Sequence, residues 1–202
     1  QRRRADEHHT LGQLVTGRGE RQHGQPPVAD DHLHRQPRGH PGLLAEWGLA
    51  DDWRGLERFA LTCVDALAGH VAVVKPQSAF FERHGSRGIA VLERVLAGLA
   101  AQARPGLATL SLLDAKRGDI GSTMDGYADA YLAVGAPLGA DAVTLSPYLG
   151  FGALASAIRT ADDAGRGVFV LARTSNAEGG DVQLADRAGR SVAQGIVDDA
   201  RW

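Results

Sequence analysis

The segment LATLSLLDAKRGDIGST, residues 107–123, decides the fold class of this chain. Its first half is an apolar run, which is typical of a strand buried on both faces of a parallel sheet. Its second half places two acids and two bases within six residues: Asp114, Lys116, Arg117 and Asp119. In parallel α/β proteins the functional side chains gather at the carboxyl ends of the strands. The segment therefore predicts a parallel sheet with charged chemistry at one edge.

Apolar runs and amphipathic stretches alternate on both sides of this segment. The apolar runs predict strands, at residues 70–77, 107–116, 141–147 and 167–174. The amphipathic stretches predict helices, within 43–69 and at 87–103, 122–135, 152–165 and 189–200. Strands that alternate with helices predict right-handed βαβ units, and so either a doubly wound sheet or a barrel. Polar residues follow all four strands, and this pattern favours a barrel, in which several strands contribute to one site.

Asp114 and Lys116 are the first candidates for chemistry. They stand two residues apart on a strand, so their side chains are expected on one face. A structural ion pair would account for them equally well, because buried charges must be paired. Lys75, at the end of another predicted strand, changes this balance, since a second lysine facing the same cleft indicates an active site rather than scaffolding.

Two glycine-containing turns give weaker indications of function. Asp119 lies in the first, and Ser122 and Thr123 are predicted to cap the helix that follows. The second, GFGALA at residues 150–155, matches the loose GxGxxA form of a dinucleotide fingerprint. The residue at the end of the next strand is Arg173, where such a site needs an acid, so we interpret these glycines as tight strand-to-helix packing.

Composition limits the kinds of binding partner and the cellular location that are expected. The chain has 202 residues, with 22 basic and 24 acidic side chains and a formal charge of -2, which argues against nucleic acid or a membrane surface as the partner. Cys63 is the single cysteine, so no internal disulfide framework is expected. No stretch reads as a signal peptide or a membrane span. We therefore expect a soluble cytoplasmic protein.

The first forty residues differ from the rest and show neither helical nor strand periodicity, so residues 1–40 are predicted to be irregular and 41–202 to form the domain. Six of the eight histidines lie there, at positions 8, 9, 23, 32, 34 and 40. No cysteine accompanies them and their spacing matches no zinc signature, so no metal site is predicted.

Four stretches carry a resemblance to a known family. They are VVKPQSAFFERHG (73–85), DAKRGDIGST (114–123), DAVTLSPYLGF (141–151) and RTSNAEGGDVQ (173–183). In this order they resemble orotidine 5′-phosphate decarboxylases, in particular the bacterial group with DAKRGDIGxT and SPYLGF motifs. The resemblance covers residues 41–202, and the DxKxxD core alone is shared with related sugar-phosphate enzymes.

The resemblance implies a (β/α)8 barrel that converts orotidine 5′-monophosphate to UMP without metal or organic cofactor, as the last step of de novo pyrimidine biosynthesis. It implies that Lys75 and Asp114 belong to the charged array around the substrate and that Lys116 donates the proton to C6. It also implies a homodimer with shared sites, into which Asp119, Ile120 and Thr123 reach from the neighbouring subunit. Ser175 matches the serine that contacts the pyrimidine.

The chain departs from the family pattern at both ends. The family's first strand, of the type CVGIDP, should precede residue 40, and we interpret the different sequence there as an altered reading frame or a misassigned start. Trp202 follows the fifth family strand, so the phosphate-binding loop is missing from the pattern. A barrel needs eight strands and about 250 residues, so we expect a partial barrel here. Ala177 also replaces the proline of TSNPEG.

Two alternatives remain open from the sequence. One is a sister barrel acting on a sugar phosphate, such as a 3-keto-gulonate-6-phosphate decarboxylase or a hexulose-phosphate synthase, which would require Mg²⁺. The other is a catalytically inactive fragment that binds nucleotide. Dependence on metal separates the first alternative from the decarboxylase, and nucleotide binding without turnover identifies the second.

Overall fold

A computed structural model describes residues 41–102 and 108–201 of the chain. The irregular segment predicted at 1–40, with its histidines and the altered first strand, lies outside the described residues. The chain divides into two compact units. The N-terminal unit comprises described residues 41–102 and 108–111, and the C-terminal unit comprises residues 112–201.

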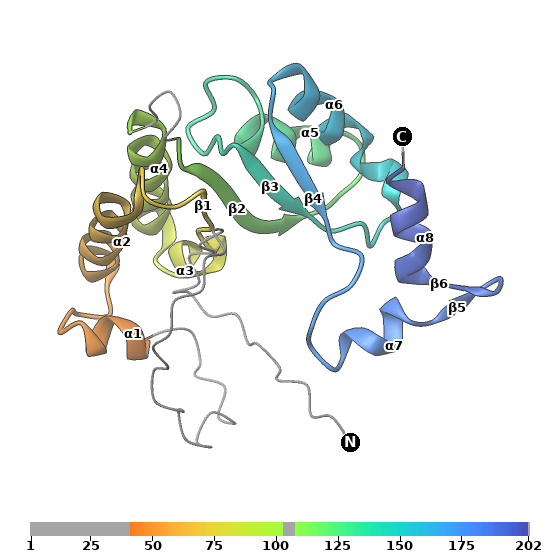
Figure 1. Ribbon diagram of the computed structural model, residues 1–202, viewed down its shortest axis with the longest axis horizontal. Helices are drawn as coiled ribbons and strands as arrows, with labels where there is room; N and C mark the ends of the chain where they lie inside the picture. The colour runs from red at the N-terminus through yellow and green to blue at the C-terminus, as the bar shows by residue number, and fades with distance from the viewer. Residues whose placement is uncertain (1–40, 103–107, 202) are drawn as a thin grey trace. The chain divides into compact units, whose positions relative to one another are not determined.

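Helices dominate the N-terminal unit. Its elements are α1 (Pro41–Glu46), α2 (Trp53–Leu67), β1 (Val73–Val74), α3 (Ser78–Glu82), α4 (Gly85–Ala101) and the first two residues of β2 (Leu110–Arg117). Helix α4 packs against both α2 and α3, and α2 and α4 run side by side in Figure 1. Strand β1 pairs in parallel with Leu110 and Ser111. The expected strand and both helices of this region are therefore present.

The apolar faces predicted for α2 and α4 form the core of this unit. The buried side chains at helical spacing are Leu56, Phe59, Ala60 and Val64 on α2, and Val91, Leu92, Val95, Leu96 and Leu99 on α4. The carboxylate of Asp52 caps α2 by accepting hydrogen bonds from the backbone N–H groups of Arg54 and Gly55, each 2.9 Å long. The cap satisfies two N–H groups that have no partner within the helix.

Tryptophans lie around the start of α2. The rings of Trp47 and Phe59 meet edge to face, with centroids 5.0 Å apart. The ring of Trp53 contacts two guanidinium groups, those of Arg54 at 4.5 Å and Arg87 at 5.5 Å from its centroid. These cation–π contacts connect the start of α2 with α4.

Parallel strands and helices alternate in the C-terminal unit. After residues 112–117 of β2 come α5 (Gly121–Tyr131), β3 (Ala142–Leu145), the 3-10 helix η1 (Phe151–Leu154), α6 (Ala155–Asp163), β4 (Gly167–Val170), α7 (Gly179–Gln183), β5 (Asp186–Arg187), β6 (Arg190–Ser191) and α8 (Val192–Asp199). Strand β3 pairs in parallel with both β2 and β4, as Figure 1 shows, and α5 packs against α6. The predicted parallel strands are confirmed, whereas α7 and the antiparallel β5–β6 hairpin were not predicted.

The start of α5 differs from the sequence-based expectation. Ser122 and Thr123 were predicted as caps, but the helix begins at Gly121 and Ile120 occupies the cap position. The reason is local: the carboxylate of Asp119 accepts a hydrogen bond of 2.8 Å from the N–H of Ile120, and Gly121 adopts a φ of +51°, which allows the chain to turn earlier. Ser122 and Thr123 are exposed in the first helical turn.

The glycines of GFGALA also have a different role from the predicted tight packing. A side-chain carbon placed on Gly150 or Gly152 would have no atom within 4 Å. Gly150 instead adopts a φ of +99°, a conformation that side-chain-bearing residues rarely take, and η1 follows directly. The expected helix therefore begins as a 3-10 turn after a glycine-dependent bend.

In the part of the chain that the structure describes, no helix is long and apolar enough to cross a membrane.

Candidate functional site

A bulge near the end of β2 shapes the site. Between paired positions, β2 advances four residues from Leu113 to Arg117 while β3 advances two, from Val143 to Leu145. Lys116 lies within this bulge with a φ of +50°, in the left-handed region that is unfavourable for a residue with a side chain. Such backbone conformations persist where surrounding contacts hold them, and they concentrate at functional sites.

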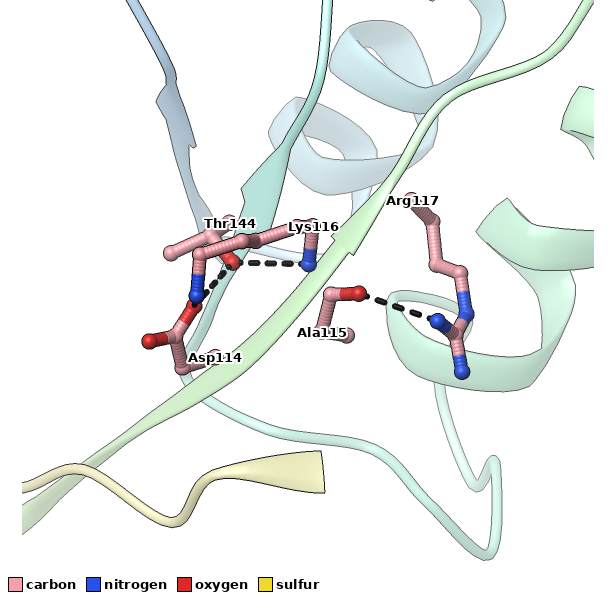
Figure 2. Close-up of polar contacts among 5 residues, drawn as sticks. All are labelled: Asp114, Ala115, Lys116, Arg117 and Thr144. Carbon is pink, nitrogen blue, oxygen red and sulfur yellow. Dashed lines mark hydrogen bonds and ion pairs between the residues drawn. The ribbon is translucent and has the colours of Figure 1, made fainter. Parts of the chain in front are cut away.

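The ammonium of Lys116 binds the carboxylate of Asp114, with Nζ 2.5 Å from Oδ1 (Figure 2). The expectation that these two side chains meet is confirmed. The route differs from the regular strand alternation assumed from the sequence, because the backbone between them is bulged. The side chain of Asp114 is 7% exposed and that of Lys116 is 43% exposed. The carboxylate is therefore embedded while the lysine remains open to solvent.

Thr144 on β3 is the residue that sequence reasoning missed. Its hydroxyl donates to Oδ1 of Asp114 and accepts from the backbone N–H of Lys116, with both hydrogen bonds 2.9 Å long (Figure 2). Thr144 is buried. The available signal was a single hydroxyl inside the apolar run AVTL of the neighbouring strand, since a buried hydroxyl needs polar partners.

Arg117, the last residue of β2, contacts both the bulge and helix α5. Its Nη1 donates a hydrogen bond of 3.0 Å to the carbonyl of Ala115, as drawn in Figure 2. Its guanidinium also lies 5.7 Å from the ring centroid of Tyr127 and 6.0 Å from that of Tyr131, two rings that stack on α5. Arg117 thus connects the bulge to the helix that follows it.

The turn after the bulge is closed by backbone contacts. The N–H of Ser146 donates a hydrogen bond of 2.7 Å to the carbonyl of Arg117. Gly118 follows, and a side-chain carbon there would collide with the backbone carbonyl of Ser146. Only glycine fits this close approach of the two strand ends.

The residues expected to reach a neighbouring subunit lie just beyond this turn. Asp119 is half-buried, and its carboxylate accepts from the N–H of Ile120. Ile120 is 62% exposed, and Thr123 is exposed on the first turn of α5. The three residues are therefore at least partly accessible, and they follow the Asp114–Lys116 pair within a few positions of the sequence.

Ser175 lies exposed in the loop between β4 and α7. The preceding residue fixes this loop: the N–H of Thr174 donates to Oε1 of Gln183 at 2.9 Å, and Nε2 of Gln183 donates to Oγ1 of Thr174 at 2.8 Å. The Thr174 hydroxyl in turn donates to the side-chain oxygen of Asn176 at 2.6 Å. Hydrogen bonds from its own backbone N–H and from the Asn176 amide lower the pKa of Glu178 in the same loop.

Lys75 belongs to the N-terminal unit, where it follows β1 and is half-buried. The pair that the structure brings together is Asp114 and Lys116, both in the C-terminal unit. That Lys75 joins them stays a prediction. Within residues 41–102 and 108–201, no cluster of three or more His, Cys, Asp or Glu side chains is arranged to hold a metal ion.

The arrangement at the β2 bulge suits charge stabilisation and proton transfer. A buried, hydrogen-bonded carboxylate fixes an ammonium whose side chain remains accessible. A fixed cation of this kind can stabilise negative charge that develops on a bound substrate and then supply a proton to it.

Comparisons with known proteins identify the family. The model of the "Orotidine 5'-phosphate decarboxylase / HUMPS family" matches residues 52–201. The chain is 61% identical over 161 residues to the orotidine 5′-phosphate decarboxylase of Salinispora tropica, covering 79% of this chain and 56% of that protein. It is 58% identical over 154 residues to the enzyme of the same name from Streptomyces coelicolor, covering 76% and 54%. The chain thus spans about half the length of the curated relatives it matches.

Solved structures agree with this result. The OMP decarboxylase of Leishmania donovani superposes with a TM-score of 0.62 at 31% identity, covering 74% of this chain and 55% of that one. A crystal structure from Streptomyces avermitilis, provisionally named orotidine 5′-phosphate decarboxylase, has a TM-score of 0.75 at 56% identity, covering 79% and 55%. The partial coverage and the parallel α/β topology confirm the fold class expected from the sequence, a (β/α)8 barrel represented in part. The chain therefore belongs to the orotidine 5′-phosphate decarboxylase / HUMPS family.

Proposed function

We propose that this chain carries the proton-donating side of an active site that decarboxylates orotidine 5′-monophosphate to UMP, the last step of de novo pyrimidine biosynthesis. One observation carries the proposal: Nζ of Lys116 lies 2.5 Å from the buried carboxylate of Asp114, in a chain that is 61% identical over 161 residues to a relative named for this activity. The family match over residues 52–201 supports the substrate class.

The proposed chemistry follows from the charges. Loss of carbon dioxide from the pyrimidine leaves an electron pair, and so negative charge, at C6 of the ring. The Lys116 ammonium, held in place by Asp114, stabilises this charge and then gives a proton to C6, so that a new C–H bond replaces the broken C–C bond. Neither an oxidant nor a reductant is needed, and no cofactor takes part in the proposed step.

Three further assignments belong to this proposal. Lys75 is a further member of the proposed charged array, and its half-buried position following β1 supports its place at a strand end. Asp114 lies next to the substrate carboxylate and disfavours the bound substrate relative to the transition state. Ser175 contacts the pyrimidine, and the hydrogen bonds of Thr174 and Gln183 hold its loop.

We also propose that two copies share their sites in a homodimer, in which Asp119, Ile120 and Thr123 of one copy contact the substrate of the other. The exposed side chain of Ile120 directly before α5 supports this part, because it is accessible at the surface for contact with a second copy. The proposed location is the cytoplasm, which suits a chain with one cysteine.

A decarboxylation assay tests the reaction. The loss of orotidine 5′-monophosphate absorbance is followed with the 202-residue chain, with and without EDTA. Turnover that is insensitive to EDTA supports the proposal. Turnover of a sugar phosphate that EDTA stops would instead identify the magnesium-dependent sister activity, and binding of UMP without any turnover would identify an inactive nucleotide-binding chain.

The role of Lys116 is tested by Lys116→Ala. This variant is expected to abolish UMP formation while the fold is retained, because the proton donor and the fixed cation are both lost. Arg159→Ala, which removes an exposed positive charge from α6, is the matched control and should turn over normally. Normal turnover by Lys116→Ala would exclude Lys116 from the mechanism.

Shared sites are tested by mixing inactive variants. Lys116→Ala and Asp119→Ala are each expected to be inactive alone, but their mixture should recover about a quarter of the activity if one site takes Lys116 from one copy and Asp119 from the other. No recovery, together with a monomeric mass by light scattering, would contradict the dimer.

A further inference from the structure

We propose that Thr144 is a positioning residue for the reaction: its hydroxyl holds the backbone of Lys116 in the left-handed conformation and orients the carboxylate that binds the Lys116 ammonium. The catalytic part of this inference rests on the proposed function. The structural part does not depend on that function: one hydroxyl binds the backbone N–H of Lys116 and also the carboxylate that binds its ammonium.

The first contact concerns the backbone. The N–H of Lys116 donates to Oγ1 of Thr144 at 2.9 Å, at a point where the ladder between β2 and β3 is interrupted by the bulge. The Thr144 hydroxyl thus replaces the missing acceptor across the bulge. It does so for the residue whose φ is +50°, a conformation that needs support from its surroundings.

The second contact concerns the side chain. The same hydroxyl donates to Oδ1 of Asp114 at 2.9 Å, and this is the oxygen that binds Nζ of Lys116 at 2.5 Å. A hydroxyl has one proton to donate, so accepting from Lys116 leaves that proton for the carboxylate. Figure 2 shows the Thr144 hydroxyl between the backbone amide of Lys116 and the carboxylate of Asp114.

Both residues of this contact are buried. As whole residues, Thr144 is 7% exposed and Asp114 is 5% exposed. Apolar neighbours flank the hydroxyl along the chain, since Val143 and Leu145 on β3 are both buried. Loss of the hydroxyl would leave a buried carboxylate with one donor fewer and a strained amide without its acceptor, which is costly for both groups.

A second threonine provides a matched control. Thr109 is buried like Thr144, and its hydroxyl likewise accepts from a backbone N–H, that of Gly69 at 2.9 Å, and donates to an oxygen, the carbonyl of Val71 at 2.6 Å. All of these partners lie in the N-terminal unit, away from the bulge along the chain. Thr109→Val therefore removes a comparable pair of hydrogen bonds, neither of which involves Lys116 or Asp114.

The experiment compares Thr144→Val, Thr144→Ser and Thr109→Val in the full 202-residue chain. The first readout is the Lys116 amide in nitrogen-15 NMR spectra, through its chemical shift and its rate of hydrogen exchange. We expect Thr144→Val to shift this signal and to speed its exchange by about tenfold or more, because the acceptor is lost. Thr144→Ser keeps the hydroxyl and should restore both properties, and Thr109→Val should leave them unchanged.

The second readout is turnover of orotidine 5′-monophosphate. Thr144→Val is expected to lower kcat by roughly tenfold to a hundredfold with a smaller effect on KM, Thr144→Ser to recover most of kcat, and Thr109→Val to retain it. If Thr144→Val does not fold, the comparison of Thr144→Ser with Thr144→Ala takes its place, with the same expected contrast.

The outcomes separate the two proposals. A wild-type chain without turnover would contradict the proposed function, while the Lys116 amide signal would still decide whether Thr144 holds that residue. An unchanged Lys116 signal in Thr144→Val would overturn the inference. So would an equal loss of kcat in Thr144→Val and Thr109→Val, because the effect would then be one of general stability.

Discussion

Lys116 and Asp114 form an ion pair whose two partners are exposed very differently: Nζ lies 2.5 Å from Oδ1, yet 43% of the lysine side chain is accessible against 7% of the aspartate side chain. The carboxylate is buried and binds the end of the lysine side chain, while much of that side chain remains accessible to solvent. This asymmetry is useful for chemistry, because the cation is positioned without being enclosed.

The left-handed backbone of Lys116 predicts an unusual order of variant stabilities. Lys116→Ala and Lys116→Gly both lose the ion pair, but only glycine adopts a φ of +50° without strain. We therefore expect Lys116→Gly to be more stable than Lys116→Ala by about 1 kcal/mol in urea unfolding. At Arg159 in α6 the order should be the usual one, with alanine more stable than glycine. Equal stabilities at position 116 would show that the left-handed conformation carries no strain.

Gly118 is predicted to be intolerant of any side chain. Gly118→Ala would place a carbon against the carbonyl of Ser146 and should cost about 2 kcal/mol or more of unfolding free energy. Gly126→Ala in α5 is the matched control, because a side-chain carbon there meets no atom within 4 Å. That change should stabilise the protein by about 0.5–1 kcal/mol, since glycine weakens a helix interior. A harmless Gly118→Ala would contradict the close approach of the two strand ends.

The cap of α2 predicts a pH dependence. The backbone N–H of Gly55 is the main cause that lowers the pKa of Asp52 below its usual 3.8. The folded state therefore binds the proton less readily than the unfolded state, and the cap's contribution is present above pH 3.8 and lost as the pH falls through the folded pKa. Asp52→Asn, which has no charge to lose, should melt at a lower temperature than the wild type at neutral pH and approach it in acid. Parallel melting curves across this range would argue against a charged cap.

The loop of Ser175 is predicted to depend on Gln183. Replacing Gln183 by Leu removes both hydrogen bonds to Thr174 and should loosen the loop, which raises the Kd for the nucleotide by roughly tenfold if Ser175 contacts it. Gln194→Leu on α8 is the control, because its amide donates instead to Asp198 at the surface. Nucleotide titration monitored by calorimetry gives the affinities, and equal affinities in the two variants would separate Gln183 from the binding site.

Much of this molecule could be predicted from its sequence. Apolar runs ending in polar residues located the parallel strands, and the helical spacing of Leu56, Phe59 and Val64 located a core face of α2, because periodicity and burial are directly linked. The pairing of Asp114 with Lys116 also followed from their proximity on one strand. These features depend on neighbouring residues along the chain.

The remaining features depend on contacts between distant segments. The bulge in β2 arises from its pairing with β3, and nothing in LLDAKR shows that Lys116 adopts a positive φ. Thr144 lies thirty residues from Asp114 in the chain, so its role required the register of the two strands. The start of α5 was misplaced because Ser122 and Thr123 are good caps by type, while the local turn at Gly121 determined where the helix begins.

The aromatic side chains are divided between the two units in a way that has a practical use. Trp47 and Trp53 lie in the N-terminal unit, whereas Tyr127 and Tyr131 stack in the C-terminal unit. Once Trp202 is replaced by phenylalanine, indole fluorescence reports on the first unit alone, and near-ultraviolet tyrosine signals report largely on the second. The chain thus contains its own pair of optical probes, and comparing them during denaturation would show whether the two units unfold in one step or in two.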